Sequence, residues 1–146
     1  MNKYYTNFFI KYPILLIIIF FSYVLPVFSE PGISTFMYHR FGEDKYPSTS
    51  VSTDQFYSHM EYILEKKIKI ISLDEIIKNI EDNNKFNEKA IAFSVDDAYS
   101  SFYEIAWPIF KKNNIPVTLF VSTDIIDKKT KGYMTWDEIK SFINDG

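Results

Sequence analysis

The sequence contains no cysteine, and its basic residues are outnumbered by acidic ones. The absence of cysteine excludes disulfide bonds and thiolate ligands for a metal. The 16 lysines and arginines stand against 19 aspartates and glutamates, for a net charge of −3. This balance provides no basic excess for a nucleic-acid-binding surface, so we expect no nucleic-acid partner.

What is present is typical of a globular protein. The 146 residues suffice for one modest domain, with 47% hydrophobic and 24% charged residues. Aromatic residues reach 18%, which is high. Exposed rings could stack on sugars, but most of these rings recur at the spacing of core residues, so we assign them to the core.

The N-terminal 29 residues have the pattern of an export signal. Lys3 and Lys11 flank a polar, aromatic start. Ile14–Phe21 is unbroken apolar sequence. A small residue, Ser29, marks a plausible cleavage point. We expect a cleaved signal peptide, with an uncleaved membrane anchor as the alternative. In either case residues 30–146 are predicted to be exported, to the periplasm or the extracellular space, with membrane contact only through residues 1–29.

From residue 32 onward, strand and helix patterns alternate four times. Apolar runs predict strands at 33–38, 68–71, 90–95 and 117–121, and 3.6-residue periodicity predicts helices near 52–67, 73–80, 99–113 and 135–143. Three of the helices begin with capping boxes, at Ser52/Gln55, Ser72/Glu75 and Thr135/Glu138. Residues 41–50 and 124–132 are expected to be loops, and Pro108 should kink or split the third helix.

Successive βα units imply an α/β fold with parallel strands and right-handed crossovers. Four units are half of a (β/α) barrel, and a free-standing doubly wound sheet is the alternative. Half a barrel would leave open sheet edges. We therefore expect residues 30–146 to be a partial domain, truncated at its C-terminus, within a longer reading frame.

The most informative stretch is the predicted third strand, which ends in two adjacent carboxylates, Asp96 and Asp97. The carboxyl ends of parallel strands are where α/β proteins place ligands and catalytic groups. One carboxylate could bind a divalent cation while the other takes a proton from water. Alternatively, Asp97 caps the following helix and Asp96 is solvated near its positive end.

His39 and Arg40 follow the first strand and are expected at the same edge of the sheet. Arg40 could pair with a carboxylate. His39 could instead be a structural histidine bonded to nearby backbone. With Tyr99, these two residues are our candidates for the substrate-binding rim of the site.

Four segments of the sequence resemble the polysaccharide deacetylase family, which includes chitin and peptidoglycan deacetylases. Ser94–Tyr99 (SVDDAY) is similar to the family's first motif, TFDDGY, and Met37–Gly42 (MYHRFG) to the first strand of one branch. Pro116–Val121 (PVTLFV) resembles a later strand, and Thr135–Glu138 (TWDE) resembles the helix before the second motif.

The resemblance implies a distorted (β/α) barrel that hydrolyses acetyl groups, chiefly N-acetyl, from an extracellular or cell-surface polysaccharide. It makes Asp96 the general base and Asp97 a ligand of a divalent metal, expected to be zinc. The family's other two ligands are a histidine pair four residues apart, which we expect beyond Gly146, so the present chain should be inactive by itself. Val95 and Ala98 stand where the family has phenylalanine and glycine.

Three other functions remain open. A degenerate relative could bind carbohydrate without catalysis, and an O-acetyl esterase could use the same site. A glycosidase would need carboxylates on separate strands, whereas the acids here are adjacent.

Overall fold

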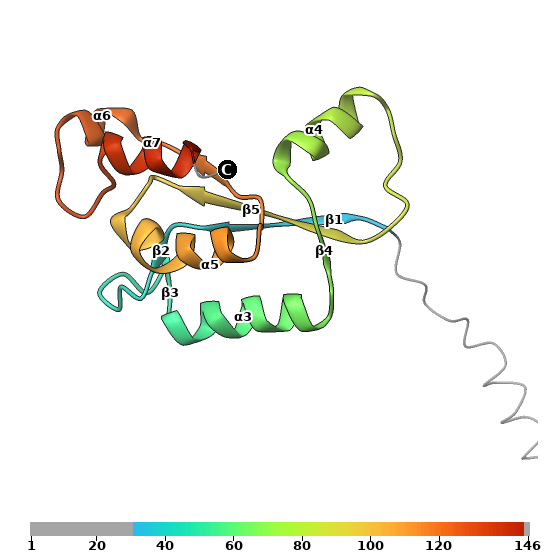
Figure 1. Ribbon diagram of the computed structural model, residues 1–146, viewed down its shortest axis with the longest axis horizontal. Helices are drawn as coiled ribbons and strands as arrows, with labels where there is room; N and C mark the ends of the chain where they lie inside the picture. The colour runs from blue at the N-terminus through green and yellow to red at the C-terminus, as the bar shows by residue number, and fades with distance from the viewer. Residues whose placement is uncertain (1–30, 145–146) are drawn as a thin grey trace, which may run out of the picture. The chain divides into compact units, whose positions relative to one another are not determined.

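The structure, a computed structural model, describes residues 31–144, so the predicted signal or anchor segment lies outside the described residues. The strands are β1 (Ile33–Tyr38), β2 (Arg40–Phe41), β3 (Ser50–Val51), β4 (Lys69–Ile70), β5 (Ala90–Asp96) and β6 (Thr118–Phe120) (Figure 1). The helices are α3 (Thr53–Glu65), α4 (Leu73–Glu81), the π-helix η1 (Phe102–Ala106), α5 (Trp107–Lys112), α6 (Thr123–Asp127) and α7 (Trp136–Asn144). Within residues 31–144, no helix has the length and apolar character needed to cross a membrane.

Strand β5 is the centre of a parallel sheet, and all four predicted strands take part in it. β1 pairs with β5 along its length, from Ile33 opposite Ala90 to Tyr38 opposite Val95. The other edge of β5 is shared, because β4 pairs with its first residues and β6 with its last three. An α/β fold with parallel strands is therefore confirmed.

The strand order differs from that of a plain barrel. Sequential barrel order would place the first predicted strand beside the second, but β5 lies between β1 and β4. The physical reason lies in β5, since six of its seven residues are buried and it needs partners on both edges. β4 is only two residues long and covers only the start of that edge. Closure into a barrel stays a prediction.

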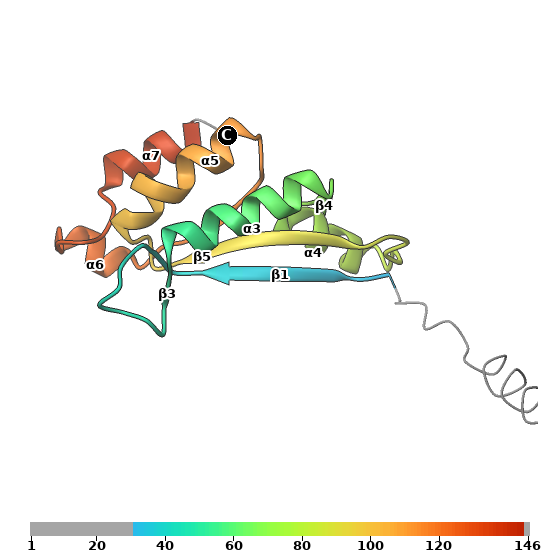
Figure 2. The ribbon, with the colours of Figure 1, turned by 90° about the horizontal axis from the view of Figure 1, so that it is seen from below.

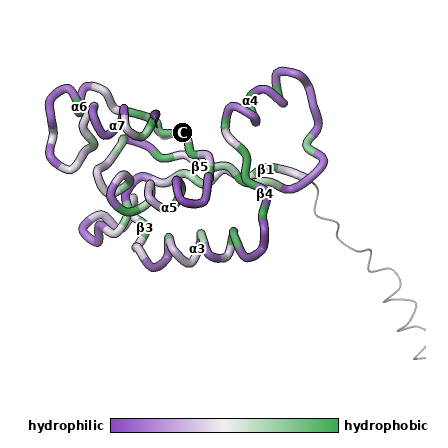
Figure 3. Tube along the Cα trace, viewed as in Figure 1, coloured by the Kyte–Doolittle hydropathy of each residue, from purple (hydrophilic) through white to green (hydrophobic). Residues whose placement is uncertain are grey.

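Helices α3, α5 and α7 lie on the same side of the β1–β5 pair (Figure 2). Phe93 of β5 faces this layer and packs edge-on against Phe110 of α5, with ring centroids 5.3 Å apart. Phe56, Met60 and Ile63 form the buried stripe of α3. Figure 3 shows how hydrophobic and hydrophilic residues are distributed along the chain: β4 and β5 are hydrophobic, and the loops around α4 and α6 are hydrophilic.

The predicted helix at 99–113 continues through Pro108 by means of a π-helical turn. Proline lacks an N–H donor, and its ring clashes with the carbonyl four residues earlier in a regular helix. Here the backbone N–H of Trp107 donates to the carbonyl of Phe102, five residues back. The wider turn of η1 precedes α5, with proline in its first turn, so the expected kink is realised as a π-bulge.

Both predicted loops contain short regular elements, which corrects the sequence-based assignment. Residues 41–50 begin and end in strands, since β2 and β3 pair in parallel. Residues 124–132 include most of the five-residue helix α6, anchored by Ile126, which is 3% exposed. Elements this short have no periodicity to detect, and tertiary contacts decide them.

Candidate active site at the end of strand β5

The two adjacent carboxylates lie where the sheet gives way to a turn. Asp96 is the last residue of β5, and Asp97 and Ala98 follow with φ angles of +70° and +55°. Two successive left-handed residues turn the chain sharply, so the carboxylates do not simply alternate across the strand. Ala98 thus adopts a conformation that glycine adopts freely, at a cost of about 1 kcal/mol for a residue with a Cβ.

Ser122, at the start of α6, fixes the side chain of Asp97. Its hydroxyl donates to Asp97 Oδ1 over 3.0 Å. Within residues 31–144, no helix N–H donates to this carboxylate, and η1 has no side-chain cap. The geometry therefore differs from the helix-cap alternative, in which Asp97 would accept from backbone N–H groups.

His39 lies beside Asp96. In the parallel register, Tyr38 is opposite Val95, so the next residue on each chain comes to the same edge of the sheet. His39 Nε2 is 3.9 Å from Asp96 Oδ2, and the two side chains are 27% and 29% exposed. This is an ion pair when the imidazole is protonated, and solvent reaches both groups.

Arg40 does not pair with the aspartates, because Glu43 and two aromatic rings engage its guanidinium. Nη1 donates to Glu43 Oε2 over 2.7 Å. The guanidinium carbon lies 3.9 Å from the ring centroid of Tyr46 and 3.5 Å from that of Tyr99. Partial burial lowers the pKa of Arg40, but the hydrogen bond and charge of Glu43 outweigh it, and the pKa is raised overall.

Tyr99 continues this stack of side chains. Its ring centroid lies 4.6 Å from that of Tyr133. Burial, followed by the hydrogen bond with Tyr133, raises the pKa of Tyr99 to about 12, against an opposing effect of Arg40. The raised pKa favours the neutral phenol form of Tyr99.

Three supporting residues were not predicted from the sequence: Glu43, Ser101 and Ser122. Ser101 donates its hydroxyl hydrogen to Glu43 Oε1 over 2.6 Å and accepts from the backbone N–H of Phe41 over 3.2 Å. This hydroxyl joins the 41–50 segment to the helix that follows the aspartates. No motif marks these residues, because 58 positions separate Ser101 from Glu43.

The described residues do not complete a metal site. Nowhere in residues 31–144 do three or more histidine, aspartate or glutamate side chains converge in a way that could hold a metal ion. Asp97 offers a carboxylate donor suited to a divalent cation, and its Oδ2 has no partner among the described residues. The predicted roles of the five site residues stay predictions.

Comparison with known proteins supports the resemblance described above. The sequence model of the polysaccharide deacetylase family matches residues 83–146, which include β5, both aspartates and α7. A poly-β-1,6-N-acetyl-D-glucosamine N-deacetylase of Staphylococcus aureus is 30% identical over 91 residues, covering 62% of this chain and 31% of the relative. The corresponding enzyme of Staphylococcus epidermidis is 29% identical over 85 residues, covering 58% of this chain and 29% of the relative.

Residues 83–146 thus carry the sequence pattern of the polysaccharide deacetylase family, and the resemblance found in the sequence is confirmed. The chain spans about a third of the length of the curated relatives that it matches.

Solved structures agree on the fold. IcaB from Ammonifex degensii superposes with a TM-score of 0.71 at 22% identity, covering 81% of this chain and 51% of that one. The Streptococcus pyogenes deacetylase PplD gives a TM-score of 0.67 at 22% identity, covering 80% of this chain and 54% of that one. At these identities the likeness supports the α/β architecture alone.

Proposed function

We propose that this protein is an exported, metal-dependent deacetylase that removes N-acetyl groups from an extracellular polysaccharide. The observation that carries the proposal is the Asp96–Asp97 turn at the end of β5, with His39 3.9 Å from Asp96, within a chain whose 83–146 segment matches the deacetylase family. The carbohydrate class follows from that match and from relatives named as polysaccharide N-deacetylases.

The proposed substrate is a polymer of N-acetylglucosamine, with a β-1,6 linkage as the first to test. The staphylococcal relatives are named for poly-β-1,6-N-acetyl-D-glucosamine. The reaction is hydrolysis of an amide, which releases acetate and leaves a free amine on the sugar.

In the proposed chemistry, Asp96 accepts a proton from the water that attacks the acetamide carbonyl. The C–N bond then breaks, and the leaving nitrogen takes up a proton to become the amine. Asp96 is only partly exposed, and the imidazole of His39 lies 3.9 Å away, a separation that one water would bridge for proton transfer. His39 therefore belongs to the rim of the reacting centre.

Zinc is part of the proposal through Asp97, the residue we assign as its ligand. The described residues do not supply a full ligand set for the metal. Ser122 holds Oδ1 of Asp97, which leaves Oδ2 as the available donor atom.

The test is an assay of amine and acetate release from poly-β-1,6-N-acetylglucosamine by the full-length protein, meaning the product of the longer reading frame expected from the sequence, before and after chelation and with zinc added back. We expect activity that chelation removes and zinc restores. Binding of the polymer without any acetate release would instead indicate a non-catalytic relative. Acetate release from an O-acetylated polymer, but not from the N-acetylated one, would indicate an esterase.

A further inference from the structure

A pocket between α6 and α7 lies beside the candidate site and has no role in the proposed chemistry. Its volume is about 510 Å³, and its wall includes Asp127, Tyr133 and Trp136. Ile126 and Met134, which are 3% and 2% exposed, contribute its buried side. The volume lies within the range of roughly 300–1,000 Å³ that is usual for small-ligand sites. We call it the α6–α7 pocket.

Backbone hydrogen bonds join this pocket to the turn that carries Asp97. The N–H of Met134 donates to the carbonyl of Ala98 over 2.8 Å, and the N–H of Ser100 donates to the carbonyl of Gly132 over 3.0 Å. The Tyr133 ring lies against that of Tyr99. The pocket wall therefore begins directly beside the residues that follow Asp97.

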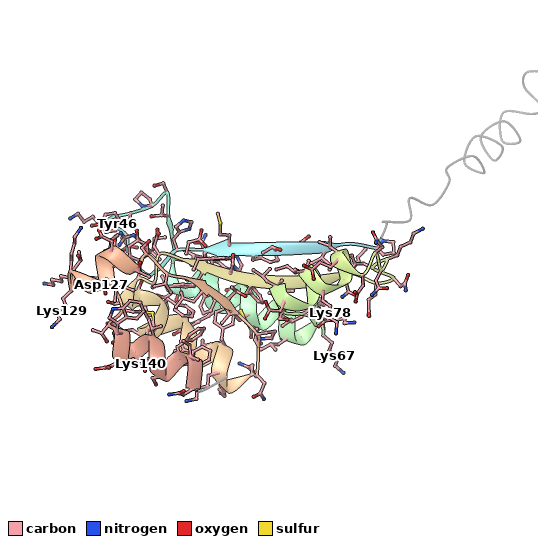
Figure 4. All side chains as sticks on the ribbon, turned by 90° about the horizontal axis from the view of Figure 1, so that it is seen from above. Tyr46, Lys67, Lys78, Asp127, Lys129 and Lys140 are labelled. Carbon is pink, nitrogen blue, oxygen red and sulfur yellow. The ribbon has the colours of Figure 1, made fainter. Side chains whose placement is uncertain are left out.

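The pocket is at the same end of the sheet as the candidate site. Figure 4 shows Asp127 and Lys129 at the end where Tyr46 lies, opposite the end that carries Lys67 and Lys78. Tyr46 in turn covers Arg40, which follows β1. A polymer whose reacting unit sits at Asp96 can thus extend over this pocket.

An aromatic ring in the pocket is held in place with part of its surface exposed. Trp136 is 37% exposed, and its indole N–H donates to Asp127 Oδ1 over 2.8 Å. Within the described part of the chain, Oδ2 of Asp127 has no partner. The pocket therefore presents an oriented aromatic surface and an available carboxylate oxygen side by side.

That combination suits a sugar ring. One face of a pyranose consists of C–H groups and packs against an aromatic surface, while its hydroxyl and amide N–H groups need acceptors. The other lining residues include Lys129 and Lys131, whose ammonium groups can donate to sugar hydroxyl and carbonyl oxygens. Trp136 provides the surface, and Asp127 provides the acceptor.

We propose that the α6–α7 pocket is a saccharide subsite, which binds a neighbouring N-acetylglucosamine unit of the polymer whose acetyl group is removed at Asp96. Trp136 stacks on that unit and Asp127 accepts a hydrogen bond from it. The choice of polymer rests on the proposed function, whereas the existence of a sugar-binding subsite rests on the pocket itself.

The test uses binding of a β-1,6-linked pentamer of N-acetylglucosamine to the intact protein carrying Asp96→Asn, so that the probe is not consumed. We expect saturable binding of the pentamer. By calorimetry, Trp136→Ala should weaken binding about tenfold or more, while Trp136→Phe should retain most of it.

The matched control is Tyr62→Ala, which removes an aromatic side chain that is 58% exposed on α3, and it should leave the dissociation constant unchanged. Asp127→Ala should weaken binding, because it removes both the acceptor and the anchor of the Trp136 ring. Equal binding by Trp136→Ala and the parent, or no saturable binding by the parent, overturns the subsite.

Turnover assays on protein that retains Asp96 distinguish failure of the subsite from failure of the proposed function. If the pocket is a subsite of a deacetylase, Trp136→Ala should raise KM for the polymer with little change in kcat. Turnover that is indifferent to Trp136 leaves the deacetylase proposal standing and overturns the subsite. Pentamer binding that depends on Trp136, without any acetate release, supports the subsite and overturns the deacetylase.

Discussion

Arg40 and Tyr99 come from segments nearly 60 residues apart, and the guanidinium carbon of Arg40 lies 3.5 Å from the ring centroid of Tyr99. Tyr46 covers Arg40 at 3.9 Å, and Glu43 binds the guanidinium. The arginine therefore holds the segment after β1 against the turn after β5, and it acts by positioning the turn that bears Asp97.

Arg40→Ala should destabilise the fold by about 1–3 kcal/mol, because it removes two cation–π contacts and leaves Glu43 without its cationic partner. Arg40→Lys should recover only part of this, since an ammonium group cannot reproduce planar stacking. Urea unfolding measures both. The control is Lys128→Ala, which breaks an exposed pair with Asp124 and should cost less than about 0.5 kcal/mol. Equal losses for Arg40→Ala and Lys128→Ala would contradict the positioning role.

The left-handed conformation of Ala98 predicts an unusual substitution pattern. Ala98→Gly should change stability by less than about 1 kcal/mol, because relief of backbone strain offsets the loss of a buried methyl group. Ala98→Val should cost about 2 kcal/mol or more, since a β-branched residue is strained at a φ of +55° and the site is fully buried.

Gly132→Ala is the matched control for that series. Gly132 also has a positive φ, +90°, but an added Cβ would meet nothing within 4 Å. Its cost should therefore be the backbone term alone, about 1 kcal/mol. Urea midpoints for the three variants separate strain from packing. An unchanged urea midpoint for Ala98→Val would show that neither backbone strain nor tight packing restrains the turn at Ala98.

The two aspartates should respond differently to the same isosteric change. Asp97→Asn should weaken zinc binding, because an amide oxygen carries no net charge, and excess zinc should partly restore activity. Asp96→Asn should leave metal occupancy near normal and lower kcat by about 10²–10⁴-fold, the usual contribution of a general base. Metal analysis and turnover in the intact protein distinguish the two. Full activity and metal content in both variants would refute the catalytic interpretation.

His39→Ala should lower activity with little loss of stability. The His39 side chain lies beside Asp96 and is 27% exposed. His59→Ala is the control, because His59 Nδ1 is 3.0 Å from the Tyr38 hydroxyl, beside the aromatic core. We expect the melting temperature to fall for His59→Ala and turnover to fall for His39→Ala. The opposite pattern would make His39 a structural residue.

Features that depend on neighbours in the sequence were predictable. The capping box of α3 is formed as expected, with Ser52 and Gln55 bonded to each other's backbone N–H groups. Thr135 and Glu138 are joined in the same way at α7. A capping box depends only on residues three positions apart. The apolar run of β5 likewise predicts a strand that is buried on both faces.

Long-range partners were not predictable, because no local pattern encodes them. Asp97 could equally have been a helix cap, and only the approach of Ser122, 25 residues later, shows which hydrogen bond it makes. The partner of Arg40 was likewise open between several carboxylates until the fold brought Glu43 to it.

The sequence by itself determined the alternation of strands and helices, the family resemblance and the position of two carboxylates at a strand end. Periodicity, capping and short motifs are local, and local chemistry is enough to specify them. The tertiary structure alone decided that β5 lies between β1 and β4, that Arg40 is held between Tyr46 and Tyr99, and that a pocket opens beside the turn that follows Asp97. Those features depend on which surfaces can be buried together, a property of the packed chain as a whole.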